Sequence, residues 1–250
     1  MVMEIIISNI VAAIIGFFLG LPIKFFRFVI ETPKNFWKIR FLTQTKYRKE
    51  LVRLSISYLF KIEIDGKFLL IKNKNRIDQF QPVGGVYKYY NEVTSEFEKL
   101  KVTSDTGYVQ DSKNKNDLRI MMPGKNVMKF FKWFFSKKNR EVSQIREFYE
   151  EIIEPGFLKS DFLLNLKYCY MHSHVDDLKY SKHFKCQEIL YAEIYNILLN
   201  KEEEEKIKEM ISTNKNCFIL VTQEEISREC LDIENLSTKI GRHANWLFKN

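Results

Sequence analysis

The segment Arg-Glu-Phe-Tyr-Glu-Glu at residues 146–151 constrains this chain more than any other, because it concentrates charge on one predicted helix. Glu150 and Glu151 follow Glu147 by three and four positions, so all three share one face of that helix. We expect the helix to begin near Asn139 and to end at Pro155-Gly156. Its opposite, apolar face repeats every third or fourth residue, at Val142, Ile145, Phe148 and Ile152.

Clustered carboxylates repel one another unless a cation neutralises them. Mg²⁺ is bound by carboxylates together with the phosphates of a substrate, so Glu147, Glu150 and Glu151 are candidate magnesium ligands. Arg146 is placed to pair with one carboxylate and to orient it. The alternative is a solvated helix face, because Glu and Arg are common on such faces.

Upstream of this helix the apolar pattern changes to that of strands. Leu54, Ile56 and Tyr58 alternate with polar residues, and residues 60–71 predict a hairpin around Asp65-Gly66. A glycine turn at Gly84 and Gly85 follows, where backbone groups can approach a metal or a phosphate closely. Further strands are expected at 162–170, 184–195 and 217–222, with helices at 202–211 and from Gln223. The pattern predicts an α+β fold, a mixed β-sheet with flanking helices.

The N-terminal part of the chain indicates a membrane. Residues 5–23 carry no charge, and at ~1.5 Å per residue a helix of this length nearly crosses a hydrocarbon core of about 30 Å. We therefore expect a transmembrane helix at 1–23, in preference to a buried core helix. Basic residues crowd the C-terminal flank, which predicts a single-pass protein with its N-terminus outside and its main domain, 51–250, in the cytoplasm.

The predicted span carries a small-residue stripe. Ser8, Ala12, Gly16 and Gly20 recur every fourth position and would form a flat face on which a second helix can pack closely. We expect this face to support homo-oligomerisation, although Gly, Ala and Ser are also common in single spans.

Two basic-aromatic segments follow, at 24–50 and at 125–140. The first predicts a juxtamembrane segment at anionic headgroups, with a linker as the alternative. The second lies at the end of an irregular stretch at about 86–139, interpreted as an insertion. Within it, Tyr87 and Tyr89 are candidates for stacking on bases, and Lys125 and Lys129 for meeting phosphates. For each of these residues, a solvated or membrane-facing surface is the simpler interpretation.

Composition excludes several other classes of protein. The four cysteines form no CxxC pair, which argues against a zinc site or a disulfide framework. A net charge of +8 is compatible with nucleic-acid binding, but a nearby anionic membrane explains the basic segments better, so no stable nucleic-acid partner is expected. His172 and His174 have only loose metal-ligand character, and Glu188 and Glu193 are on a strand that can reach the site or face solvent.

The hairpin, the glycine turn and the charged helix together resemble the Nudix superfamily over roughly residues 52–230. Its signature is G-x5-E-x7-R-E-U-x-E-E-x-G-U, with U aliphatic. The resemblance implies that Glu147, Glu150 and Glu151 bind metal, with Glu147 able to activate water, and that Gly85 offers a carbonyl. The chain departs from the signature: Gly85 and Arg146 are 61 positions apart instead of 14, Lys138 occupies the position of the first Glu, and Phe148 that of an aliphatic residue.

A span, a basic segment and a Nudix-like domain together resemble the transmembrane effectors with a SMODS-associated Nudix domain in CBASS anti-phage systems. The resemblance implies a bacterial inner-membrane protein that senses a cyclic nucleotide second messenger, oligomerises and disrupts the membrane. The alternative is an anchored, Mg²⁺-dependent Nudix hydrolase of nucleoside diphosphate derivatives, in which Glu147 and Arg146 are catalytic.

Overall fold

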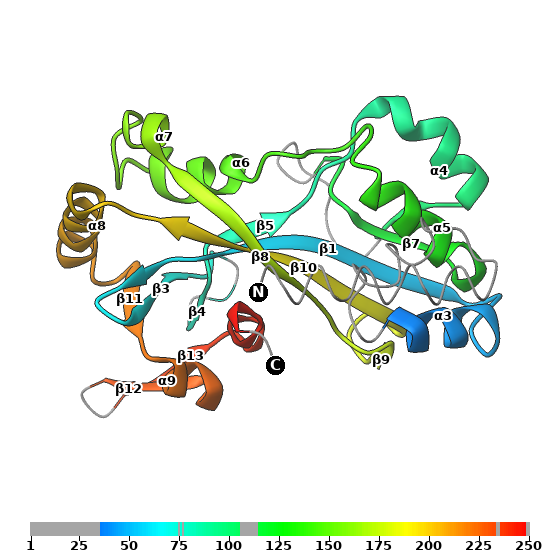
Figure 1. Ribbon diagram of the computed structural model, residues 1–250. Helices are drawn as coiled ribbons and strands as arrows, with labels where there is room; N and C mark the ends of the chain where they lie inside the picture. Colours follow the sequence, from blue (N-terminus) through cyan, green and yellow to red (C-terminus); the bar gives the residue numbers. More distant parts are fainter. Residues whose placement is uncertain (1–35, 75, 77, 106–114, 234–235, 249–250) are drawn as a thin grey trace, which may run out of the picture.

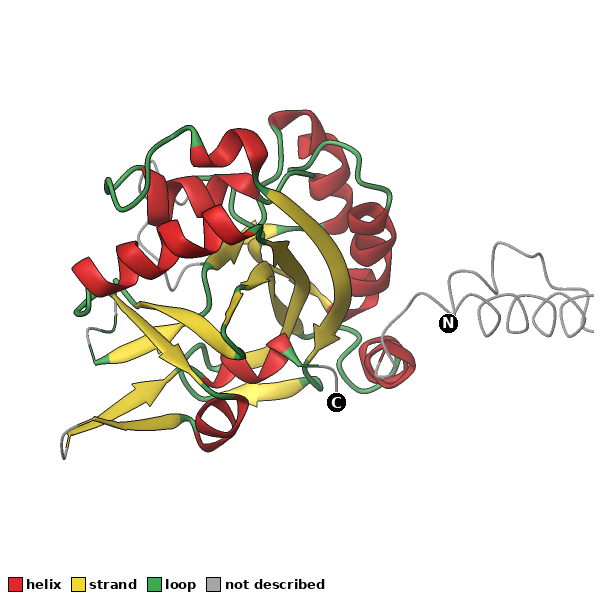
Figure 2. Cartoon of the chain, turned by 60° about the vertical axis from the view of Figure 1, so that its left-hand side comes forward, coloured by secondary structure: helices red, strands yellow, loops and turns green. Residues whose placement is uncertain are grey.

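Two mixed β-sheets with helices packed against them make up the computed structural model, which describes residues 36–250 apart from 75, 77, 106–114, 234–235 and 249–250 (Figures 1 and 2). The expected α+β class is confirmed, with two sheets in place of the single sheet predicted. The expected transmembrane helix at 1–23 and its small-residue stripe lie outside the described residues. Within those residues, no helix is both long enough and apolar enough to cross a membrane.

Strand β1 (Leu51–Lys61) is central to the first sheet, because its two faces differ sharply. Val52, Leu54, Ile56, Tyr58 and Phe60 are all fully buried, as their alternation predicts. The residues between them face the opposite side. The other strands of this sheet are β5 (Gly84–Val86), β6 (Thr103–Ser104), β7 (Arg119–Pro123), β8 (Lys167–Val175), β9 (Lys179–Ser181) and β10 (Cys186–Leu198). β10 pairs with β1 in parallel, whereas β5 and β7 pair with it antiparallel.

The second sheet begins with the predicted hairpin. Asp65 and Gly66 both have positive φ, of 48° and 74°, as the tight turn between two strands requires, so this prediction is confirmed. The strands are β2 (Glu63–Ile64), β3 (Lys67–Lys72), β4 (Gln79–Gln81), β11 (Phe218–Val221), β12 (Cys230–Ile233) and β13 (Leu236–Ile240). A smaller core of Phe68, Leu70, Ile226 and their neighbours lies against this sheet.

The helices pack mostly on the buried face of β1 (Figure 1). They are α3 (Phe36–Gln44), α4 (Thr94–Leu100), α5 (Gly124–Phe135), α6 (Ile145–Phe148), α7 (Phe162–Asn165), α8 (Lys201–Thr213) and α9 (Gln223–Arg228), with short 3-10 turns η1 (Asn91–Val93) and η3 (Arg242–Leu247) and a π-helical turn η2 (Tyr149–Ile153). Capping boxes start α8 at Asn200 and α9 at Thr222, consistent with the predicted helices there. The strand predicted from residue 162 begins only at Lys167, because α7 precedes it.

The stretch at 86–139, predicted to be irregular, is part of the core. It supplies β7, which pairs with β1, and the amphipathic helix α5. Phe130, Phe131 and Phe134 of α5 are fully buried and Trp133 nearly so. The aromatic residues of the second basic-aromatic segment therefore stabilise the domain, and the interpretation that a membrane explains them is wrong. Their spacing on α5 is that of a core-facing helix.

Candidate functional site

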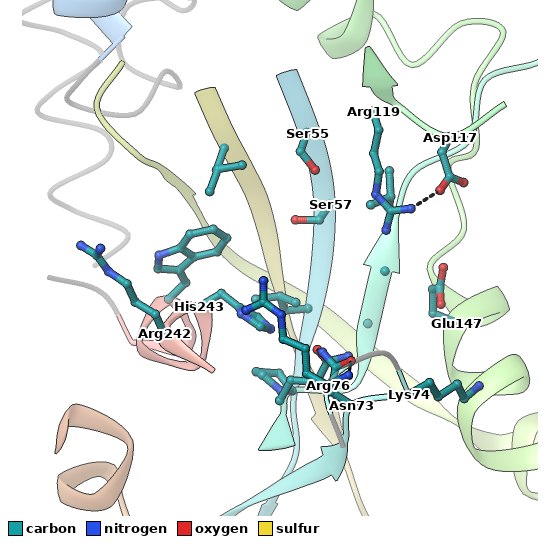
Figure 3. A pocket seen from close by; sticks show the side chains of 18 of the residues that line it. Ser55, Ser57, Asn73, Lys74, Arg76, Asp117, Arg119, Glu147, Arg242 and His243 are labelled. Carbon is teal, nitrogen blue, oxygen red and sulfur yellow. Dashed lines mark hydrogen bonds and ion pairs between the residues drawn. The ribbon is translucent and has the colours of Figure 1, made fainter. Parts of the chain in front are cut away.

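A cavity of about 620 Å³ opens on the face of β1 that the helices leave uncovered (Figure 3). Arg53, Ser55 and Ser57 line it from β1. Their partners across the parallel pairing, Glu188 and Leu190 of β10, line it too. The polar residues of β1 were not predicted as site residues, yet their alternation with the buried ones is the signal that identifies them.

The glycine turn brings backbone and carboxylate close together at one end of the cavity. Gly84 has a φ of 150°, and a Cβ on it would lie 2.3 Å from the Tyr58 carbonyl oxygen. A Cβ on Gly85 would lie 2.0 Å from Cδ of Glu147. The Gly84 amide donates to Glu151 Oε2 at 3.1 Å. Gly84 is therefore required by its φ and by the nearby backbone, whereas a side chain at Gly85 would displace the Glu147 side chain. Both glycines stand beside the predicted carboxylates.

The helix that carries these carboxylates is shorter than predicted. It begins at Ile145 instead of near Asn139, and Val142, assigned to its apolar face, is exposed. Residues 149–153 form a π-helical turn, in which the amide of Glu154 donates to the carbonyl of Tyr149 at 2.8 Å. Such turns are rare and are frequent at functional sites.

Arg146 holds the carboxylates together. Its guanidinium donates to Glu147 at 2.6 Å, to Glu150 at 3.3 Å and to the Val86 carbonyl at 2.8 Å. It also donates to both carboxylate oxygens of Glu141, at 2.9 and 3.1 Å. The match to the Nudix signature did not single out Glu141, which lies five positions before Arg146.

The ion pair with Glu141 changes the meaning of Lys138. Lys138 stands where the signature has Glu, but its side chain is exposed, whereas Glu141 is buried against Arg146. A carboxylate is therefore paired with Arg146 despite the altered spacing. Lys138 at the signature position therefore does not mean that Arg146 lacks a carboxylate partner.

Burial makes Glu147 and Glu151 weaker acids than ordinary carboxyl groups. It raises the pKa of Glu151 to about 8, and the charge of Glu147 adds to this rise while the Gly84 amide opposes it. Burial also raises the pKa of Glu147, against the effect of Arg146. A bound cation would favour the charged form of both. These raised pKa values are typical of functional carboxyls.

The residues present fit a magnesium ion in their chemistry. Among the described residues, no group of three or more His, Cys, Asp or Glu side chains is arranged to hold a metal ion. Mg²⁺ is usually held by only one or two carboxylates and completed by phosphates and water. Glu147 and Glu151 are the two donors that the geometry offers, because both lie against the glycine turn. Arg146 pairs with Glu147 as well as with Glu150, but Glu150 is one-third exposed.

Most cations in the cavity are already paired. Arg53 binds Asp105 and Glu188, Arg119 binds Asp117, and Lys179 binds Asp176. Lys74, Arg76 and Arg242 form no ion pair with the described part of the chain. Figure 3 shows Arg242, Arg76 and Lys74 in this order from left to right, with Glu147 above Lys74. Unpaired cations along one wall are suited to a ligand with several negative charges.

The far end of the cavity is aromatic. Trp246 of η3 lines it and stacks on His174, with ring centroids 4.8 Å apart. Burial, together with the charge of Arg76, lowers the pKa of His243 to about 4, so this imidazole is neutral near pH 7. A neutral imidazole beside an indole offers hydrogen bonding and stacking to an uncharged ring system. None of this end was predicted as a binding site.

The remaining predicted residues lie elsewhere. Tyr87 is fully buried between Tyr58 and Phe134, and its hydroxyl donates to Glu193, so no face of its ring is open to a base. Tyr89 packs on Phe97. Lys125 and Lys129 are exposed on α5 and do not line the cavity. The positions of the two tyrosines and two lysines thus contradict their assignment to this ligand site.

Of the candidate residues on β8 and β10, one lines the cavity and the others do not. Glu188 faces the cavity and pairs with Arg53, whereas Glu193 is buried on the opposite side among tyrosine hydroxyls. His172 interacts with the Trp246 carbonyl and His174 with Asp176. These contacts give both histidines a structural role.

Comparison with known proteins identifies the domain. A family model described as the SMODS-associated NUDIX domain matches residues 51–248. Searches of the curated proteins and of the solved structures gave no match.

Proposed function

The chain belongs to the SMODS-associated NUDIX domain family, and we propose that it is a membrane-anchored anti-phage effector of the CBASS type. Its Nudix-like domain senses a cyclic nucleotide second messenger. Ligand binding drives self-association, and the assembled spans disrupt the bacterial inner membrane. The observation that carries the proposal is the cavity lined by Lys74, Arg76 and Arg242, three cations that form no ion pair with any described residue.

The cavity supports binding of a nucleotide with more than one phosphate. Its volume of about 620 Å³ lies in the range of about 300–1,000 Å³ usual for small-molecule sites. Arg76 and Arg242 can form charge-assisted hydrogen bonds to phosphate oxygens. Trp246 and His243 at the same end offer a base a stacking surface and a neutral hydrogen-bonding partner. Lys74 and the carboxylates lie at the opposite end, where Mg²⁺ on Glu147 and Glu151 would bring positive charge to a second phosphate.

Sensing and turnover make different demands on such a site. A receptor needs only that the ligand bind one state of the protein better than another, which shifts the population toward that state. In the proposed assembly, that state is held within the bilayer by the stripe of Ser8, Ala12, Gly16 and Gly20. The uncharged run at 5–23 supplies the anchor, with the N-terminus outside.

One observation favours the hydrolase as a second candidate. Glu141 restores a carboxylate partner to Arg146, and the raised pKa of Glu151 suits proton transfer near neutral pH. In that enzyme, bound Mg²⁺ would polarise a diphosphate of a nucleoside derivative. Glu147 or Glu151 would accept the proton of the attacking water, and Arg146 would orient them.

Product analysis separates the two candidates. The full-length protein in detergent is incubated with Mg²⁺ and with panels of cyclic nucleotides and nucleoside diphosphate derivatives. The receptor proposal predicts that a cyclic nucleotide binds and is recovered intact. Rapid cleavage of any panel member, lost in Glu151→Gln and retained in the exposed-site control Glu209→Gln, would contradict it and establish the hydrolase.

A further inference from the structure

Two basic-aromatic segments far apart in the sequence meet on one face of the domain. Phe36 of α3 packs edge-on against Phe131 of α5, with ring centroids 4.7 Å apart. Gln44 donates to the carbonyl of Lys125 at 3.2 Å, and the Lys125 amide donates to the carbonyl of Arg48 at 3.0 Å. Residues 36–49 and 124–138 therefore form a continuous surface, the α3–α5 face.

The α3–α5 face is strongly cationic. Neither of its two segments contains Asp or Glu. None of its basic residues lines the cavity, so a ligand bound in the cavity does not contact them. The exposed basic residues are Arg40, Lys46, Arg48, Lys49, Lys125, Lys129, Lys132, Lys137 and Lys138, together with Lys38, which pairs with Asp177 at 2.9 Å.

The same face exposes two large aromatic side chains. Trp37 is 72% exposed and Phe41 62%, and they lie one turn apart on α3. Phe36 and Ile39 on the other side of this helix are buried in the core. An exposed indole and phenyl ring among cations is the pattern of a helix that lies at an anionic membrane interface.

We propose that the α3–α5 face docks on an anionic phospholipid bilayer, with Trp37 and Phe41 inserted at headgroup level and the lysines of α5 over lipid phosphates. This docking rests on the proposed anchor. The uncharged run ends at Ile23, and residues 24–35 join it to α3. At ~3.3 Å per residue this linker reaches at most about 40 Å, which keeps the face at high effective concentration near the bilayer. Docking fixes which side of the domain faces the lipid.

Tryptophan quenching in the full-length protein tests the docking. The chain has three tryptophans: Trp37 on this face, Trp133 in the core and Trp246 in the cavity. In vesicles that contain phosphatidylglycerol, lipids brominated near the headgroup quench the protein's fluorescence, and Trp37→Phe removes most of this quenching. The control Trp246→Phe retains it. Quenching that survives Trp37→Phe overturns the proposal.

Charge reversal tests the electrostatic part. Replacing Lys125, Lys129 and Lys132 by Glu lowers Trp37 quenching in phosphatidylglycerol vesicles to the level seen in phosphatidylcholine alone. The control reverses Lys201 and Lys206, which are exposed on α8.

Equal quenching in both lipids for the unaltered protein contradicts the proposal, as does binding of single-stranded DNA by the α3–α5 face without quenching. Flotation of the vesicles reports the anchor separately: protein that floats without quenching disproves docking alone, whereas protein that does not float disproves the anchor.

Discussion

Gly85 lies so close to Glu147 that a Cβ at position 85 would be 2.0 Å from Cδ of the carboxylate. Gly85→Ala must therefore displace Glu147 from the cavity wall, and we expect it to weaken binding of Mg²⁺ and of phosphate-bearing ligands. Gly156→Ala is the matched control, because a Cβ there meets nothing within 4 Å although its φ of 84° is strained. Calorimetry should show that Gly156→Ala lowers the melting temperature but leaves ligand affinity unchanged.

The ion pair of Glu141 with Arg146 predicts a contrast between two nearby positions. Glu141→Ala removes a buried partner of Arg146 and should lower the free energy of unfolding by about 1–3 kcal/mol, since Arg146 keeps Glu147 and Glu150. Lys138→Glu restores the signature residue at an exposed site and should change it by no more than about 0.5 kcal/mol. Chemical denaturation measures both. If adding Lys138→Glu restored the stability lost in Glu141→Ala, the pairing would be assigned to the wrong residue.

Glu151 gives the domain a defined pH dependence. Its pKa rises from an ordinary 4.5 to about 8 on folding, so the folded state binds more protons than the unfolded state between these values. The contribution of this group to stability is complete at low pH and is lost as the pH rises toward 8. Thermal denaturation across this range should therefore show a smaller decline for Glu151→Gln than for the unaltered protein, with Glu209→Gln as control. Identical pH profiles would contradict the burial of this carboxyl.

Magnesium should act most strongly where Glu151 is ionised. Mg²⁺ binds the carboxylate form, so binding releases a proton and strengthens as the pH passes through about 8. We expect Mg²⁺ to raise the melting temperature more above that pH than well below it, and Glu147→Gln to abolish the effect. An increase of the same size at both ends of the range would show that the ion binds elsewhere.

Tyr87 is expected to matter for stability alone. Its hydroxyl donates to the buried carboxylate of Glu193, which also accepts from Tyr195 at 2.8 Å. Tyr87→Phe should cost about 1–3 kcal/mol of unfolding free energy, the penalty of an incompletely satisfied buried group. Ligand affinity at temperatures where the variant is folded should stay as in the unaltered protein. A selective loss of affinity would restore Tyr87 to the ligand site.

Local patterns in the sequence predicted the parts of the site that depend on short spacings. The turn at Asp65-Gly66, the burial of Leu54, Ile56 and Tyr58, and the meeting of Gly85 with Glu147 follow from alternation, turn chemistry and the resemblance. The π-helical turn could not be predicted, because one additional residue in a single short turn does not change the spacing of the apolar residues recognisably.

Long-range packing is what the sequence did not reveal. Phe130, Phe131 and Phe134 stand among lysines, which favours a membrane-facing segment, whereas helical spacing buries them beneath β1. Arg76, Arg242 and Trp246 come from a loop and a short 3-10 turn that sheet pairing brings to one cavity. No local period links positions so distant, so these cations and this ring emerge only from the tertiary structure.

Titration of the full-length protein with cyclic di- and trinucleotides, with affinity and particle size measured together, tests the receptor most directly. One of these ligands should bind saturably and increase the size of the particle. Arg76→Ala and Arg242→Ala should each weaken binding about tenfold or more, the equivalent of about 1.4 kcal/mol, whereas Arg228→Ala on the exposed surface of α9 should not. Failure of every cyclic nucleotide to bind, or binding that neither Arg76→Ala nor Arg242→Ala weakens, would contradict a cyclic-nucleotide receptor built on this cavity.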